Sequence, residues 1–72
     1  MTKEKKEIYY IVMIISMFAK DVKYTIKEAF LYLNKYGAMK FLTDNYEAEH
    51  LLSENEVLED LKEISRKNGG SL

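Results

Sequence analysis

IYYIVMIISMFA, at residues 8–19, is the most informative stretch of the chain, because eleven of its twelve residues are apolar. Apolar residues spaced three and four apart predict one long helix from about Lys3 to Val22. The stripe that we expect to face the core comprises Ile8, Ile11, Val12, Ile15, Phe18 or Ala19, and Val22. Much of the remaining helix surface is covered by Tyr9, Tyr10, Met13, Ile14 and Met17. A helix that is apolar nearly all round is covered on several sides. We therefore expect the face of this helix that lies opposite the core to form a dimer seam or a partner site.

The length of 72 residues allows one domain, with an expected folded core at about 4–67 and a frayed tail at 68–72. Domains this small usually depend on disulfides, a metal or self-association. The sequence has no cysteine, so disulfides are excluded and association remains open. With no proline, three glycines and 47% hydrophobic residues, the composition favours an all-α fold, a compact bundle of about four helices.

The apolar run at residues 8–19 also raises the question of an export signal or a membrane anchor. Residues 2–7 mix three lysines with two glutamates, whereas the first region of a signal peptide is plainly basic. The run contains two tyrosines and is shorter than the ~20 residues that cross a bilayer. We therefore expect a core helix of a cytoplasmic protein that makes no membrane contact.

A capping box at Thr25–Glu28 begins the second predicted helix, because the threonine and the glutamate can satisfy each other's free backbone N–H groups. Its expected inner face comprises Ile26, Ala29, Phe30, Leu33 and Tyr36. Gly37 follows as the expected left-handed C-cap. Residues 38–43 then predict a short third helix, whose inward side chains are Ala38, Phe41 and Leu42.

Asp44 and Asn45 end the third helix, and residues 46–52 predict a connector. Its expected apolar anchors are Tyr46, Leu51 and Leu52. Ser53–Glu56 is a second capping box, which opens a last helix with a core stripe of Val57, Leu58, Leu61 and Ile64.

The charges are sorted along the chain although the net charge is only −1. Residues 44–63 carry eight acids and one base, Lys62. Two interpretations fit this segment: a solvated acidic face, or a docking surface that attracts a basic partner. General nucleic-acid binding requires a basic footprint, which the acidic segment opposes.

Residues suited to catalysis are scarce. Cysteine is absent, and the one histidine, His50, lies beside Glu49 in the connector. His50 and the neighbouring carboxylates have poor spacing for a metal site, and we expect the imidazole to bond a helix end or a backbone carbonyl. The sequence therefore predicts a protein that is not an enzyme, with no metal, no cofactor and no small-molecule substrate.

A helix-turn-helix remains an alternative, because residues 29–42 predict a helix, a glycine turn and a second helix. The candidate recognition helix at residues 38–43 offers one base, Lys40, and is followed by Asp44. Phosphate contacts and base contacts both require more donors than this. The alternative function is a small DNA-associated regulator that uses the turn at residues 36–40.

The order of several short motifs resembles a known family. These motifs are Leu33–Gly37, the pair Phe41 and Leu42, Asn45–Glu47, His50 and the acidic last helix. In this order they resemble the small bacterial helical proteins grouped as domain of unknown function 3791. The resemblance implies a compact helical fold with no assigned activity, and an accessory or antitoxin-like role beside a neighbouring protein. The chain departs from the pattern after His50, where Leu51 and Leu52 replace a more polar pair, which puts a role for the histidine loop in doubt.

The leading hypothesis is a non-enzymatic protein–protein interaction module that binds a protein partner or forms a homodimer. The spare face of the first helix and the acidic last helix are the expected binding surfaces. The candidate partner-binding residues are Tyr9, Tyr10, Met13, Met17, Glu56, Glu59 and Asp60.

Overall fold

The apolar run lies inside the longest helix of a five-helix structure. The computed structural model describes residues 3–72. Its helices are α1 (Lys3–Val22), α2 (Ile26–Lys35), α3 (Ala38–Asp44), α4 (Tyr46–Glu49) and α5 (Glu54–Lys67). The described residues contain no strand, so the predicted all-α bundle is confirmed.

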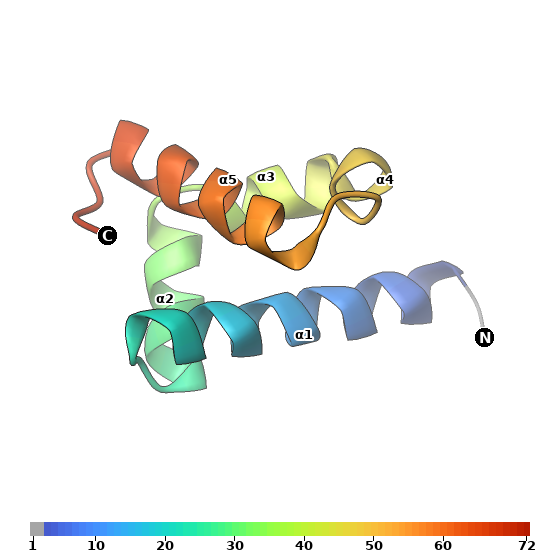
Figure 1. Ribbon diagram of the computed structural model, residues 1–72, viewed down its shortest axis with the longest axis horizontal. Coiled ribbons are helices and arrows are strands. Elements are labelled where there is room, and N and C mark those ends of the chain that lie inside the picture. Colours follow the sequence, from blue (N-terminus) through green and yellow to red (C-terminus); the bar gives the residue numbers. More distant parts are fainter. Residues whose placement is uncertain (1–2) are drawn as a thin grey trace.

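The helices form two layers joined at one end. α1 makes the lower layer, α3 and α5 lie together above it, and α2 rises from the end of α1 to the upper layer (Figure 1). The short α4 follows α3 above the N-terminal half of α1 (Figure 1). The apolar core fills the space between the layers, and its buried members are Ile14, Ile15, Phe18, Ala19, Ala29, Leu33, Ala38, Leu42, Val57, Leu58 and Leu61.

The predicted core stripe of α1 is partly wrong. Ile15, Phe18 and Ala19 are buried as expected, but Ile8 and Val12 remain 60% and 53% exposed. Ile14, which we placed outside the stripe, is completely buried. Because α1 is apolar nearly all round, its periodicity cannot select the inward face, which depends on where α2 and α5 pack.

The inner face of α2 is narrower than predicted. Ala29 and Leu33 are fully buried, whereas Ile26 and Phe30 are 58% and 43% exposed. The capping box at its start is confirmed: Glu28 N donates to Thr25 Oγ1 and Thr25 N donates to Glu28 Oε1. Gly37 has the predicted left-handed backbone, with a φ of +77°.

The second capping box is only half formed. Glu56 N donates to Ser53 Oγ at 3.3 Å, as a capping box requires. The Glu56 carboxylate accepts from the Ser53 hydroxyl at 2.9 Å instead of from the Ser53 backbone. The segment predicted as a connector begins with the short helix α4, which the sequence interpretation missed. Two of its expected anchors are also wrong, because Leu51 and Leu52 are 77% and 37% exposed.

Residues 68–72 are packed against the bundle instead of frayed. Asn68 Nδ2 donates to the Tyr36 carbonyl at 2.7 Å, and Leu72 N donates to Tyr32 Oη at 2.9 Å. A Cβ at Gly70 would overlap the Tyr32 hydroxyl and lie 2.9 Å from the Ser65 carbonyl. The expectation of a frayed tail failed because it left out Tyr32 of α2 and Tyr36, which directly follows α2.

α1 ends in a Schellman motif, in which Tyr24 N donates to the Ala19 carbonyl at 2.8 Å and Lys23 N to the Lys20 carbonyl at 3.4 Å. This geometry places Lys23 in the left-handed region, with a φ of +61°. The left-handed conformation costs a residue with a Cβ about 1–2 kcal/mol, a cost that glycine avoids.

Lys23→Gly should therefore raise the free energy of unfolding by about 0.5–1 kcal/mol, since greater chain entropy in the unfolded state offsets part of the relief. Urea denaturation followed by circular dichroism measures the change. Lys20→Gly is the control, because Lys20 has a helical backbone and its replacement should destabilise. Equal destabilisation by both variants would contradict the motif.

Candidate protein-interaction site

Four large apolar side chains are grouped on the outside of α1. Ile8, Tyr9, Val12 and Met13 are 60%, 64%, 53% and 42% exposed. They form two adjacent pairs one helical turn apart, so their side chains lie next to one another. We call these four residues the α1 face. Single exposed apolar residues are ordinary on protein surfaces, whereas a contiguous group marks an interaction site.

The structure divides the predicted partner-binding residues of α1. Tyr9 and Met13 belong to the α1 face, but Tyr10 and Met17 are half-buried and pack against the core. The sequence interpretation missed Ile8 and Val12 as members of the face because it assigned them to the core. The signal that could have identified them is that Ile8 and Val12 lie one helical turn apart and directly beside Tyr9 and Met13 in the chain.

The second region of interest surrounds a buried carboxyl group at the end of α4. Glu49 is only 5% exposed, although it belongs to the most acidic segment of the chain. Its carboxyl group interacts with Asp60 through a side-chain hydrogen bond, and Glu56 lies close enough to act on its charge. We call Glu49, Glu56 and Asp60 the acidic cluster. Residue type and spacing do not predict the burial of Glu49, because that burial depends on how α4 packs.

The acidic cluster strongly disfavours a second negative charge at Glu49. Burial raises the pKa of Glu49 from 4.5 to about 7, with further contributions from the hydrogen bond and charge of Asp60 and the charge of Glu56. The Glu49 carboxyl group is therefore neutral over a wider pH range than an exposed glutamate.

Two buried polar atoms near the acidic cluster have no hydrogen-bond partner: Glu49 Oε1 and Tyr10 Oη. Burial raises the pKa of Tyr10, and the charges of Glu49 and Tyr46 add to this effect. Buried polar atoms are nearly always hydrogen-bonded in folded proteins. Glu49 Oε1 and Tyr10 Oη are exceptions to this rule.

An aromatic group holds α4 against α1. Tyr10 meets Tyr46 edge to face, with ring centroids 5.4 Å apart, and His50 stacks on Tyr46 at 4.6 Å. His50 Nδ1 donates to the Tyr46 carbonyl at 2.8 Å, so the predicted bond to a backbone carbonyl is confirmed. The Glu49 carboxyl group interacts with Asp60 of α5 and not with the His50 ring. This arrangement gives no support to a catalytic pair of Glu49 and His50.

The remaining predicted partner-binding residues lie on α5. Glu56 is exposed, and Asp60 is half-buried in the acidic cluster. Glu59 is exposed and lies 3.6 Å from Lys62, whose ammonium also binds Asp21 of α1 at 2.5 Å. Lys62, the one base among residues 44–63, therefore pairs with Asp21 and Glu59 and not with the acidic cluster.

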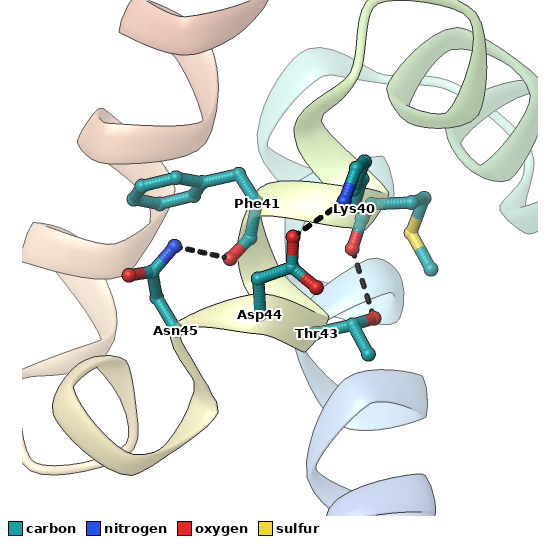
Figure 2. A network of polar contacts seen from close by, with 6 residues as sticks. Lys40, Phe41, Thr43, Asp44 and Asn45 are labelled. Carbon is teal, nitrogen blue, oxygen red and sulfur yellow. Dashed lines mark hydrogen bonds and ion pairs between the residues drawn. The ribbon is translucent and has the colours of Figure 1, made fainter.

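The predicted helix-turn-helix pair is present as α2 and α3, but α3 offers little to nucleic acid. The Lys40 ammonium lies 2.7 Å from the Asp44 carboxylate, so the only base of this helix is paired within the helix (Figure 2). The same view shows Asn45 Nδ2 bonded to the Phe41 carbonyl. The Thr43 hydroxyl donates to the Met39 carbonyl. These polar groups are occupied within their own segment.

Two broader findings concern the part of the chain that the structure describes. None of its helices has both the length and the apolarity needed to cross a membrane. Within residues 3–72, no three histidine, aspartate or glutamate side chains are placed to hold a metal ion together.

Comparison with known proteins identifies a family but no characterised relative. The family model described as "Protein of unknown function (DUF3791)" matches residues 9–68. No curated protein and no solved structure matches the chain. The match covers Tyr9, Val12 and Met13 of the α1 face, the acidic cluster and all of α5, and leaves out Ile8.

Proposed function

The chain belongs to the DUF3791 family, and from this premise we propose that it is a non-enzymatic interaction module that forms a homodimer through the α1 face. The observation that carries the proposal is the exposure of Ile8, Tyr9, Val12 and Met13 side by side on one helix. Removing apolar surface from water provides about 25 cal/mol per Å², so covering this group favours association.

The chemistry of the α1 face suits a two-fold contact. In a symmetric dimer the same surface meets itself, so a charged group at its centre would face its own copy. The four side chains carry no charge and therefore can pack against their equivalents without repulsion. Antiparallel packing of two α1 helices brings both pairs of apolar residues into contact.

A module of this kind acts through what it binds. We place it in the cytoplasm, as an accessory or antitoxin-like partner of another protein. His50 bonds a backbone carbonyl and stacks on Tyr46, which supports a structural role for the residue that a catalytic site would most readily use. No specific observation favours the DNA-associated regulator over this proposal.

Mass measurement in solution tests the homodimer. We expect the mass to rise toward twice 8.5 kDa as the concentration increases from micromolar to millimolar. Val12→Lys should weaken dimerisation by about tenfold or more, because it buries a charge in the seam. Circular dichroism should show unchanged helicity, since the Val12 side chain is 53% exposed.

Leu31→Lys is the matched control, because Leu31 is an apolar residue of α2 with a comparable exposure of 54%. It should leave the dimer intact. A wild-type protein that remains monomeric at millimolar concentration would refute the proposal. Equal loss of dimer in both variants would place the seam elsewhere than the α1 face.

A further inference from the structure

We propose that the outer side of α2 binds an acidic amphipathic helix of a protein partner, whose apolar side chains pack on Ile26, Phe30 and Leu31 and whose carboxylates pair with the neighbouring lysines. The inference rests on the proposed interaction role but not on the homodimer, because this surface lies on α2 and the dimer seam lies on α1. Either proposal can therefore fail without the other.

Three large apolar side chains lie on the outside of α2. Ile26, Phe30 and Leu31 are 58%, 43% and 54% exposed, although Ile26 and Phe30 were expected to face the core. Ile26 and Phe30 are one helical turn apart, so their side chains lie next to each other. The inner side of the helix is occupied by Ala29 and Leu33, which are fully buried. The three outer side chains therefore form an apolar surface that the rest of the described chain leaves largely uncovered.

Lysines surround this apolar surface. Lys27 lies one turn before both Phe30 and Leu31, and Lys35 lies one turn after Leu31. Lys23 is exposed in the segment that leads from α1 into α2. Among the described residues, no carboxylate forms an ion pair with any of these three lysines. We call the three apolar residues and the three lysines the α2 face.

The acids of this region are already engaged within the fold. Residues 20–36 carry four lysines and two acids, Asp21 and Glu28. Asp21 pairs with Lys62, and Glu28 accepts the Thr25 backbone N–H in the capping box. The α2 face therefore presents unpaired positive charge beside exposed apolar side chains. A partner surface that carries both carboxylates and apolar side chains is complementary to it.

The order of side chains around α2 favours a protein helix over a lipid surface. A helix that lies in a membrane interface has one continuous apolar side and places its lysines on the opposite side. At about 100° per residue, Lys27 instead lies between Phe30 and Leu31 around the helix axis. A partner helix can place a carboxylate opposite this cation and apolar side chains on either side of it.

Fluorescence anisotropy with a labelled peptide tests the α2 face. The probe is a capped peptide of two repeats of Leu-Glu-Glu-Leu-Leu-Glu-Ala, whose leucines share one side of a helix. The full chain should bind it, and the affinity should fall by about tenfold when sodium chloride rises from about 50 mM to about 500 mM. The same peptide with glutamine in place of every glutamate is the neutral control, and it should bind about tenfold more weakly or worse.

Variants separate this site from the dimer. Lys27→Glu should weaken the acidic peptide by about tenfold or more, because it replaces an attraction by a repulsion, and Leu31→Gln should do so by removing apolar contact. Lys6→Glu is the matched control, because it makes the same charge change at an exposed position of α1. It should bind as the wild type does, and so should the seam variant Val12→Lys.

Three results would overturn the α2 face as a site for an acidic helix. The first is a chain that does not bind the acidic peptide at millimolar concentration. The second is equal binding of the neutral peptide, or normal binding by both Lys27→Glu and Leu31→Gln. The third is capture of the chain by phosphatidylglycerol vesicles without binding of the acidic peptide, which would assign this surface to a membrane.

Discussion

Phe18→Ala should lower the free energy of unfolding by about 3–5 kcal/mol, the largest effect expected of a single substitution in this chain. Phe18 is fully buried between the two layers, and its ring stacks on Tyr32 with centroids 6.1 Å apart. A domain of this length has a total stability of only about 4–11 kcal/mol. The substitution should therefore remove a large share of the total stability.

Urea denaturation monitored at the helical circular dichroism band measures this loss. Phe30→Ala is the matched control, because it removes the same atoms from a side chain that is 43% exposed. It should cost about 1 kcal/mol, since nearly half of the Phe30 side chain already faces water. Similar losses in both variants would mean that the core is not centred on Phe18.

Glu49→Gln should stabilise the protein by about 3 kcal/mol at pH 8 and change its stability little near pH 4.5, because a shift of one pKa unit is worth about 1.4 kcal/mol. The pKa of Glu49 is raised on folding from 4.5 to about 7. The protonated carboxyl group therefore contributes stability that is fully present below the unfolded pKa and is lost as the pH rises through about 7. Glutamine keeps the shape, cannot ionise, and can donate to Asp60 at every pH.

The measurement is a pair of urea curves at pH 4.5 and pH 8 for the wild type and the variant. Glu54→Gln is the control, because it removes one charge from an exposed position on the first turn of α5. Its effect should be below about 0.5 kcal/mol at both pH values. A Glu49→Gln variant that is less stable than the wild type at pH 8 would contradict burial of a protonated carboxyl group.

Local chemistry explains which parts of the fold could be predicted from sequence. The capping box at Thr25–Glu28 and the left-handed Gly37 depend on residues close in the chain, and both are confirmed. The core stripe of α5 was also predictable, since Val57, Leu58 and Leu61 lie on a helix whose other faces are polar. In each case the structure of a short segment depends on residues within that segment.

The candidate sites were less predictable because they depend on packing. Tyr9 and Met13 were expected at a partner surface and lie on the α1 face, but so do Ile8 and Val12, which were assigned to the core. Glu56 and Asp60 were predicted for their charge alone. Their neighbour Glu49 could not be identified, because an acid in an acidic segment is ordinarily exposed.

The sequence by itself determined the four longer helices, the cap at Thr25 and the excess of apolar residues on α1, since these follow from residue type and spacing within one helix. Only the tertiary structure decided which side of α1 is covered, because a helix that is apolar all round can bury any face at similar gain. The tertiary structure also placed Glu49 against Asp60, since that contact depends on how α4 lies against α5 and not on a pattern within either helix.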